Sequence, residues 1–434
     1  MAWKWRDVPR LLASSNRKDA VVRAWNARAW LPLYRLAGLY RRTWGGGRMV
    51  VTVVGSTGKT TTAYILQKML GTQDGGRVNL NYGLHLVRKL VSPRRRDKPL
   101  VLEVGISRVG QMGRYAWMLR PDIAVVTTVG SDHHPSLGGQ EGIFREKSMM
   151  VRALRPGGLA VLNGDDPKVR AMADLTSAKV VFYGLGPQNQ VRAKDISLDW
   201  PSGSGFTLVA PGIRQRMALP LFGEHLIMCA LACCAVALHL GLGLDEIASA
   251  LRGLAPLPGR MHPVWLDDGV CLLEDHNKGT AETFQAALDF LAKVPAKRKV
   301  VVLGALETPM GGGHRIAKEF GGQTGGFADL LLVMGSDSKG MASAAKKAGM
   351  AEENIINCGR SVHQAAQELS SRLQPGDLVL IKGRRDMQLR RITLMLLGKP
   401  VSCSVKQCEW TSLICDKCGM LAGPTANSDQ DRRI

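Results

Sequence analysis

The chain has 434 residues, and at about 150 residues per domain this length allows roughly three domains. Hydrophobic residues make up 45% and charged residues 22% of the chain, which excludes a disordered, collagen-like or disulfide-scaffold protein. The 58 Lys and Arg residues against 36 Asp and Glu residues give a net charge of +22. This charge favours anionic partners: nucleotides, anionic lipid, nucleic acid or acidic substrates.

Residues 1–48 are basic and rich in tryptophan, with Leu33, Leu36 and Leu39 at helical spacing. The pattern predicts a basic amphipathic helical segment and leaves two interpretations open. One is a surface that lies on an anionic membrane or binds an acidic partner, and the other is a helix that packs on its own domain. Because the first ten residues lack the apolar core of a secretory signal, we expect a cytoplasmic protein, peripheral at most to the inner face of the membrane.

The pattern changes at Met49, where MVVTVV predicts a strand, GSTGKTTT a glycine loop and AYILQKML a helix. Further apolar runs predict buried strands at Leu100–Val104, Ile123–Thr127, Leu159–Leu162 and Val180–Tyr183. Strands that alternate with helices indicate a mostly parallel α/β sheet, and we assign residues 49–258 to one central domain.

The stretch Leu226–Gly243 approaches the apolar length of a membrane span, but it contains His239 and many small residues. We therefore expect a buried core helix, in which Cys229, Cys233 and Cys234 serve core packing.

A second α/β series follows the Pro- and Gly-rich stretch Ala255–Arg260, which we take as the domain boundary. Its predicted strands are Val270–Glu274, Val300–Leu303, Leu330–Met334 and Leu378–Ile381. They indicate a second, Rossmann-like α/β domain over residues 259–400.

Residues 401–434 form a tail whose polar end is predicted to be disordered. Cys403, Cys408, Cys415 and Cys418 give the spacing C-x4-C-x6-C-x2-C. A structural zinc site is one hypothesis for these four residues, and reduced, unligated thiols are the other.

The loop after the first strand has the sequence context of a phosphate-binding loop, between a strand and a helix. Its glycines allow backbone N–H groups to approach phosphate oxygens, and the helix N-terminus adds a favourable dipole. Lys59 is expected to reach the β- and γ-phosphates, and the Thr60 hydroxyl to bind Mg²⁺. The loop is a shortened variant, because Val53 stands where the longer pattern has glycine. The predicted nucleotide-binding residues here are Gly55, Ser56, Thr57, Gly58, Lys59, Thr60 and Thr61.

This loop resembles the nucleotide loop of the Mur ligase family, the ATP-dependent peptide-bond-forming enzymes of cell-wall precursor synthesis. Further stretches follow in the family's order: LEVGIS, GSDHH, FREKSMM, LAVLNGDDP, GEHLIMCALACCAVA, PGR and LVLIKGRRDM. The resemblance runs from about Val50 to about Gly398. It implies a central P-loop domain that binds ATP and Mg²⁺, followed by a Rossmann-like domain. The chemistry is consistent, because joining a carboxylate to an amine requires activation that ATP provides by forming an acyl phosphate.

The resemblance also implies roles for individual residues. Glu103 and His133 are expected to bind Mg²⁺, and Lys147, carbamylated, would bind a second Mg²⁺. The alternative for Lys147 is a solvated lysine on a helix surface. We assign Lys59, His133 and Lys147 as catalytic.

In the second domain, three residues join the predicted ATP site. Asp275 aligns with the family aspartate that holds the ribose, with a capping or solvated acid as the alternative. Asn277 lies two residues later, and Arg260 resembles the arginine that meets the ATP phosphates.

Within the family, the pattern is most similar to that of the members that add D-alanyl-D-alanine, but it departs from theirs. Only about 48 residues precede the loop, too few for their UDP-sugar domain. Leu226 and Cys229 replace two asparagines, and the stretch after the ribose aspartate begins His276-Asn277. The segment Gly304–Thr308 lacks an aspartate that the family carries.

We therefore expect an ATP- and Mg²⁺-dependent ligase that joins a carboxylate to the amine of an amino acid or dipeptide. Its substrate would be a specialised one of envelope or secondary metabolism, not linked to UDP. The alternatives are a shortened D-alanyl-D-alanine-adding cell-wall ligase, and a non-catalytic nucleotide-binding protein with a basic membrane or nucleic-acid surface. Nucleic acid is the less favoured partner, since no recognised binding motif is present.

Overall fold

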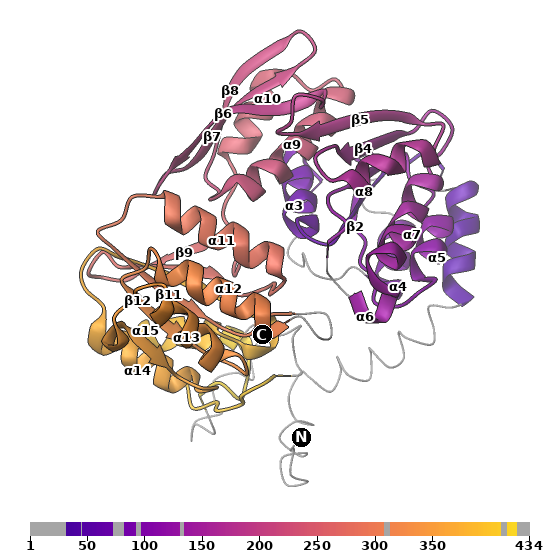
Figure 1. Cartoon of the computed structure of the whole chain (residues 1–434). Coiled ribbons are helices and arrows are strands. Elements are labelled where there is room, and N and C mark those ends of the chain that lie inside the picture. The colour runs from indigo at the N-terminus through magenta and orange to yellow at the C-terminus, as the bar shows by residue number, and fades with distance from the viewer. Residues whose placement is uncertain are drawn as a thin grey trace, which may run out of the picture. The chain divides into compact units, whose positions relative to one another are not determined.

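The computed structural model describes residues 32–44, 46–72, 82–92, 97–130, 134–307, 313–408 and 415–422 (Figure 1). The chain divides into two compact units. The first unit contains the chain up to Ile196, Gly205–Leu219 and His225–Leu254, and the second contains Ser197–Ser204, Pro220–Glu224 and the chain from Ala255 onward.

The first unit is built on an eight-stranded sheet with the strand order β2-β1-β3-β4-β5-β6-β7-β8. The first six strands in this order, β2 to β6, pair in parallel. This confirms the predicted mostly parallel sheet. The strand bounds are β1 Val50–Val54, β2 Leu100–Glu103, β3 Ile123–Val126, β4 Leu159–Asn163, β5 Lys179–Gly184, β6 Val191–Asp199, β7 Gly203–Ala210 and β8 Ile213–Leu219.

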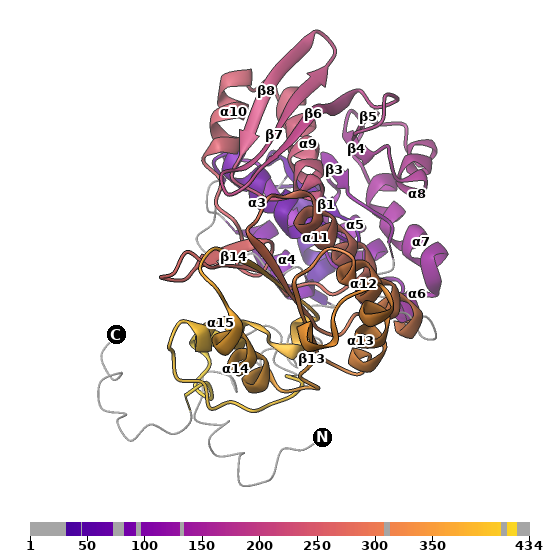
Figure 2. The ribbon, with the colours of Figure 1, turned by 60° about the vertical axis from the view of Figure 1, so that its left-hand side comes forward.

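Helices lie between the strands from β1 to β5, and further helices follow β8. The helices of this part of the chain are residues 32–42, α3 Lys59–Met69, α4 Gly83–Val91, α5 Gln111–Leu119, α6 His134–Leu137, α7 Gly139–Arg152, α8 Pro167–Arg170, the 3-10 turn η2 Ala171–Leu175, α9 Glu224–His239 and α10 Leu244–Arg252. Figure 2 shows α10 beside β8, the last strand of the sheet.

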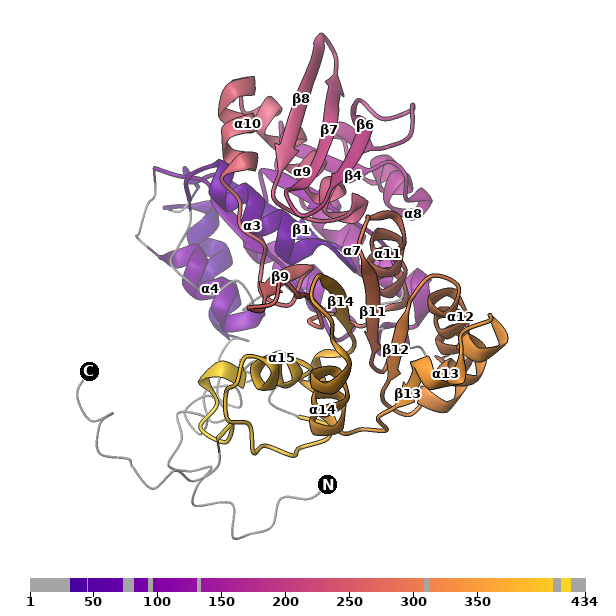
Figure 3. The ribbon, with the colours of Figure 1, turned by 90° about the vertical axis from the view of Figure 1, so that its left-hand side faces the viewer.

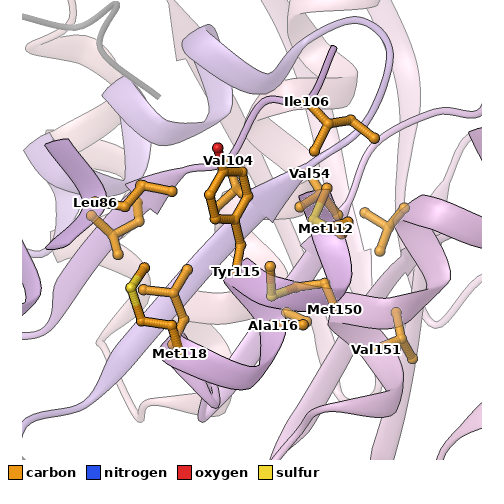
Figure 4. Packing of buried hydrophobic residues seen from close by; sticks show 14 of the residues in the cluster. Val54, Leu86, Val104, Ile106, Met112, Tyr115, Ala116, Met118, Met150 and Val151 are labelled. Atoms are coloured by element: carbon orange, nitrogen blue, oxygen red, sulfur yellow. The ribbon is translucent and has the colours of Figure 1, made fainter. Parts of the chain in front are cut away.

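The core of the first unit explains why β1 is so rich in β-branched residues. All five residues of β1 are buried, as expected for a central strand of a parallel sheet that is covered on both faces. On one face, Val54 packs in a cluster with Met112 and Tyr115 of α5 and Met150 of α7 (Figure 4). This packing fixes the end of β1, where the predicted phosphate-binding loop begins.

Helix α9 contains the apolar stretch that sequence analysis singled out. Its Cys229, Cys233 and Cys234 are buried, as predicted for core packing, and Cys233 Sγ lies 3.4 Å from the Thr62 carbonyl of α3. Among the described residues, no helix has the length and apolar character needed to cross a membrane.

The second unit contains a six-stranded sheet with the order β13-β12-β11-β14-β10-β9, in which only the β10–β9 pair is antiparallel. Figure 3 shows β14, β11, β12 and β13 side by side. The strands are β9 His262–Trp265, β10 Cys271–Asp275, β11 Arg298–Leu303, β12 Leu330–Val333, β13 Ile355–Asn357 and β14 Asp377–Lys382. The helices are α11 Ala281–Lys293, α12 Gly313–Gly325, α13 Ser338–Lys347, α14 Val362–Arg372 and α15 Arg390–Leu396, with 3-10 turns η3 Glu352–Asn354, η4 Arg385–Met387 and η5 Cys415–Lys417.

The helix at residues 32–42 packs on the first unit, as the second interpretation of the N-terminal segment predicts. The buried Arg41 guanidinium lies 2.6 Å from Asp122 Oδ2 and donates to the carbonyls of Leu119 and Arg48. Residues 1–31 of the same segment lie outside the described residues.

All nine strands expected from apolar runs are present, whereas β6, β7, β8, β9 and β13 were not predicted. The strand β6 has the mixed sequence VRAKDISLD with several exposed positions, and β13 has only three residues. Neither gives the continuous apolar run by which a buried strand is recognised.

Candidate active site

The loop that connects β1 to α3 requires glycine at two positions. Gly55 and Gly58 have φ angles of +152° and +78°, in the region that side chains rarely adopt. A Cβ on Gly55 would lie 1.8 Å from the Thr127 hydroxyl, and one on Gly58 would lie 3.2 Å from Cys229 Sγ. The loop therefore runs close against the residues that follow β3.

Two threonines after β3 hold this loop in place. The Ser56 N–H donates to the Thr128 carbonyl at 2.9 Å, and the Thr57 N–H donates to the Thr128 hydroxyl at 3.0 Å. The Thr127 hydroxyl donates to the Thr57 carbonyl at 2.5 Å. Asn163, at the end of β4, donates to the Thr127 carbonyl at 2.8 Å. Three adjacent strand ends thus build one rigid edge.

Two lysines converge on Ser56. Lys59, the first residue of α3, donates to the carbonyls of Gly55 and Ser56 at 2.7 and 3.1 Å. Lys147 on α7 is only 4% exposed, and its ammonium donates to the Ser56 hydroxyl at 2.8 Å. The alternative of a solvated Lys147 is therefore wrong. Its carbamylation stays a prediction.

The geometry of this edge fits a phosphate group. The loop leads into the N-terminus of α3, whose first turn contains no acidic residue, so the helix dipole and Lys59 favour an anion there. Thr60 and Thr61 are buried in that turn. Their placement agrees with the predicted binding of nucleotide and Mg²⁺, which stays a prediction.

The predicted Mg²⁺ ligands are only partly described. Glu103 ends β2 and lies in register with Val53 of β1, so its backbone is beside the start of the loop. His133 lies outside the described residues, and its metal-binding role stays a prediction. Glu146, one residue before Lys147, accepts from the N–H groups of Gly110 and Met112 at 2.6 and 3.1 Å and so ties α7 to α5.

In the second unit, Asp275 ends β10 and is paired with a lysine that sequence analysis did not assign. Lys382 is the last residue of β14, its side chain is fully buried, and its ammonium lies 2.6 Å from Asp275 Oδ2. Burial lowers the pKa of Lys382, and the neighbouring Asp275 opposes that effect. The other oxygen of Asp275 accepts from the Met261 N–H at 3.3 Å. The alternative of a solvated acid is wrong, because Asp275 is buried.

The residues around Arg260 are held by Asn277. The Asn277 side chain donates to the Pro258 carbonyl at 2.7 Å, and its N–H donates to the Gly259 carbonyl at 3.1 Å. Gly259 has a φ of +68°, which favours glycine at this turn. Asn277 is therefore a positioning residue for the segment that carries Arg260; direct ATP contacts of either residue stay predictions.

The stretch Gly304–Glu307, which follows β11, gives a further polar group at this edge. Glu307 lies 2.9 Å from the ammonium of Lys278, and its N–H donates to the Gly279 carbonyl at 2.6 Å. The stretch Gly304–Glu307 contains no aspartate, so Glu307 is the carboxylate that it contributes.

The carboxylate of Glu274, the residue before Asp275 in β10, is almost completely buried. Imidazole nitrogens of His262 and His276 each lie 3.6 Å from it, and Arg390 donates to it at 2.7 Å. Burial alone would raise the pKa of Glu274, but the neighbouring imidazoles hold it well below its usual range. Arg390 also pairs with Asp416, which ties the cysteine-containing tail to the sheet.

The tail cysteines lie close to the segment that follows β14, where the Cys408 N–H donates to the Asp386 carbonyl at 2.7 Å. Cys415 Sγ lies 3.2 Å from the Gln388 side chain, and the buried Arg391 donates to the carbonyl of Cys403. Burial raises the pKa of the Cys415 thiol to about 12. Across the described part of the chain, no three His, Cys, Asp or Glu side chains are arranged to hold a metal ion. The structure therefore gives no support to the zinc hypothesis, which stays a prediction.

Sequence reasoning found the loop and both strand-end acids, but it missed Lys382 and Asn163 as site residues. Both belong to stretches, LVLIKGRRDM and LAVLNGDDP, that had been noted for resemblance alone. Their position at the last residue of a buried parallel strand was the available signal, because such ends gather at one edge of a sheet.

Comparison with known proteins gives matches over both units. Residues 53–237 match the Mur ligase middle domain, and residues 259–385 match the Mur ligase glutamate ligase domain. The chain is 28% identical over 363 residues to the UDP-N-acetylmuramoyl-tripeptide–D-alanyl-D-alanine ligase of Bacillus subtilis, covering 82% of this chain and 77% of that protein.

Solved structures give the same picture. A MurF structure from Acinetobacter baumannii superimposes with a TM-score of 0.74 at 25% identity, covering 85% of this chain and 81% of that one. The MurF ligase of Thermotoga maritima, solved in complex with ADP, gives a TM-score of 0.73 at 24% identity over 85% of this chain and 83% of that one. At 24% identity, the likeness to the Thermotoga maritima structure shows the fold alone.

Proposed function

Because this chain belongs to the Mur ligase family of ATP-dependent, C–N bond-forming ligases, we propose that it joins a carboxylate to an amine through an acyl phosphate. The observation that supports this most is the convergence of Lys59 and Lys147 on Ser56, within a glycine loop that opens a helix. A loop of this kind binds phosphate through backbone N–H groups, the helix dipole and lysine.

The proposed reaction has two steps. In the first, a carboxylate oxygen attacks the γ-phosphorus of ATP, an acyl phosphate forms and ADP leaves. In the second, the amine attacks the acyl carbon, the C–N bond forms, and phosphate leaves with the oxygen that the carboxylate supplied. Bound Mg²⁺ would neutralise negative charge on the phosphoryl group. Its proposed ligands are Thr60, Glu103, His133 and a carbamylated Lys147.

The chain's own residues contribute positioning and charge. Lys59 places an ammonium at the loop, where negative charge develops on the transferred group. Ser56 receives hydrogen bonds from both Lys147 and the Gly130 N–H, so its hydroxyl fixes the loop to α7 and to the segment after β3. Because these groups are held before substrate binds, little reorganisation is needed during the reaction.

We place the ATP-binding domain at residues 49–258 and the second ligase domain at 259–400, with 1–48 and 401–434 as flanking segments. The protein is expected to act in the cytoplasm on small-molecule substrates. Arg260, Asp275 and Asn277 of the second domain are proposed to bind ATP.

The proposed substrate pair is a specialised one, without a UDP group on the carboxylate. Two features support a changed acceptor and nucleotide environment: Ala305 with the ion-paired Glu307, and His276-Asn277 after Asp275, the proposed ribose-binding residue. The second candidate is the addition of D-alanyl-D-alanine to a UDP-linked tripeptide, which is favoured by the names of the relatives.

Phosphate release from ATP, with product masses followed, distinguishes these candidates. The purified full chain is given UDP-N-acetylmuramoyl-tripeptide with D-alanyl-D-alanine, and then a pool of other carboxylates and amines. We expect a new amide mass only from the pool. An amide from the cell-wall pair would establish the second candidate instead. Silence with every pair would overturn the ligase proposal and favour a non-catalytic nucleotide-binding protein.

A further inference from the structure

The outward face of the helix at residues 32–42 exposes an apolar stripe. Leu36 and Leu39 are 62% and 54% exposed, and Trp44, just after the helix, is 86% exposed. The two leucines lie three residues apart and therefore share one face of the helix. Large apolar side chains gathered on one face indicate an interaction surface rather than scattered exposure.

The opposite face of this helix is firmly packed, so the stripe cannot turn inward. Arg41 is buried against Asp122. A Cβ on Gly38 would lie 2.2 Å from the ring of Trp117 in α5, and that ring makes an edge contact with Tyr34. The helix is thus fixed to the first unit with its leucines outward.

Arginines surround the stripe. Arg35 and Arg114 line a shallow groove together with Pro32, Tyr34 and Leu36. Arg42 lies over the Trp117 ring, 4.2 Å from its centroid. Within the part of the chain that the structure describes, none of the guanidinium groups of Arg35, Arg42 and Arg114 is paired with a carboxylate.

The charge of the two contributing segments has one sign. Residues 32–48 and 108–120 together contain seven arginines and no Asp or Glu. A second copy of the chain is disfavoured as the occupant, because self-pairing of this face would bring like charges together. An anionic surface offers the complementary charge.

We propose that this surface, formed by Leu36, Leu39, Trp44, Arg35, Arg42 and Arg114, binds the headgroup region of an anionic lipid bilayer. Leucine and tryptophan side chains are suited to the boundary between headgroups and acyl chains, while arginines are suited to lipid phosphates. Residues 1–31, which precede the helix, have the same composition, with seven Lys and Arg, two Asp and the tryptophans Trp3, Trp5, Trp25 and Trp30. The inference is independent of the ligase chemistry.

The test is co-sedimentation of the full chain with vesicles of phosphatidylcholine alone and of phosphatidylcholine with about one third phosphatidylglycerol, at physiological ionic strength. The test variant is Leu36→Glu/Leu39→Glu. The matched control is Met149→Glu/Leu397→Glu, which adds the same charge at two partly exposed apolar positions elsewhere. A third variant, Arg35→Gln/Arg114→Gln, removes charge without touching the leucines.

We expect the wild type and the control to bind the anionic vesicles and not the neutral ones. The leucine variant and the arginine variant should each lower binding about tenfold or more. Lys59→Ala should bind vesicles normally, so that failure here and failure of the ligase proposal are distinguishable. Absence of wild-type binding, or equal loss in the control, would overturn the proposal. So would a leucine-dependent dimer or DNA complex without vesicle binding.

Discussion

The carboxyl ends of the parallel strands form one edge of each sheet, termed the first edge in the first unit and the second edge in the second unit. The two edges are built in opposite ways. At the edge of the first unit, backbone carbonyls and hydroxyls hold a glycine loop, and the ammonium of Lys59 contacts carbonyl oxygens of that loop. At the edge of the second unit, opposite charges are paired with one another, as in Asp275 with Lys382 and Glu307 with Lys278. The first edge is organised to receive an anion, whereas the second holds its carboxylates in ion pairs that fix their orientation.

The largest effect is expected from removing Lys59, the charge proposed to bind phosphate at the first edge. Lys59→Ala should lower turnover about a hundredfold to a thousandfold, since a preorganised charge at the transferred group is lost. Steady-state phosphate release measures it, with circular dichroism to establish folding. The control is Lys68→Ala on the exposed side of the same helix. Wild-type turnover in a folded Lys59→Ala protein would remove the basis of the comparison.

At the second edge, breaking an ion pair should lower the free energy of unfolding. Asp275→Asn leaves the fully buried Lys382 without its charged partner, so we expect a loss of about 3 kcal/mol, or roughly a hundredfold in the unfolding constant. Urea unfolding measures the loss, with the exposed Asp268→Asn as control. The double variant Asp275→Asn/Lys382→Met should recover part of it. If Asp275→Asn and the control Asp268→Asn destabilise the protein equally, the ion pair between Asp275 and Lys382 does not contribute to stability.

Lys147 sharpens the comparison, because it connects the first edge to α7. Lys147→Ala should lower turnover about tenfold to a hundredfold or more, because it removes both the hydrogen bond to Ser56 and a proposed Mg²⁺ ligand. Arg145→Ala on the exposed side of α7 serves as the control. An unchanged kcat in Lys147→Ala would mean that Ser56 needs no such support.

The last effect appears only at acid pH and concerns the stability of the second unit. The pKa of Glu274 is below that of an unfolded glutamate, so its contribution is present above about pH 4 and is lost as the pH falls toward the folded pKa. Glu274→Gln should therefore lose less stability than the wild type between neutral and acid pH, by about 1.4 kcal/mol for each pH unit that separates the unfolded from the folded pKa. Urea unfolding of the wild type and Glu274→Gln at several pH values gives the free energy of unfolding as a function of pH. The same slope for both proteins would contradict the prediction.

The first edge could be largely predicted from sequence because its parts are local. The strand, glycine loop and helix lie in one stretch of the chain, and each has a residue signature of its own. The second edge depends on Asp275 meeting Lys382, a residue 107 positions later, and no local pattern specifies such a contact. The buried state of Lys147 was likewise hidden, because a lysine on a helix is ordinarily solvated.

The most direct test of the central claim follows the oxygen that the carboxylate supplies. The substrate pair that supports turnover is used with heavy oxygen in the carboxylate, and released phosphate is examined by mass spectrometry. Transfer through an acyl phosphate predicts one labelled oxygen in the phosphate and release that depends on the amine. Unlabelled phosphate, or release that is the same without amine, would contradict the account.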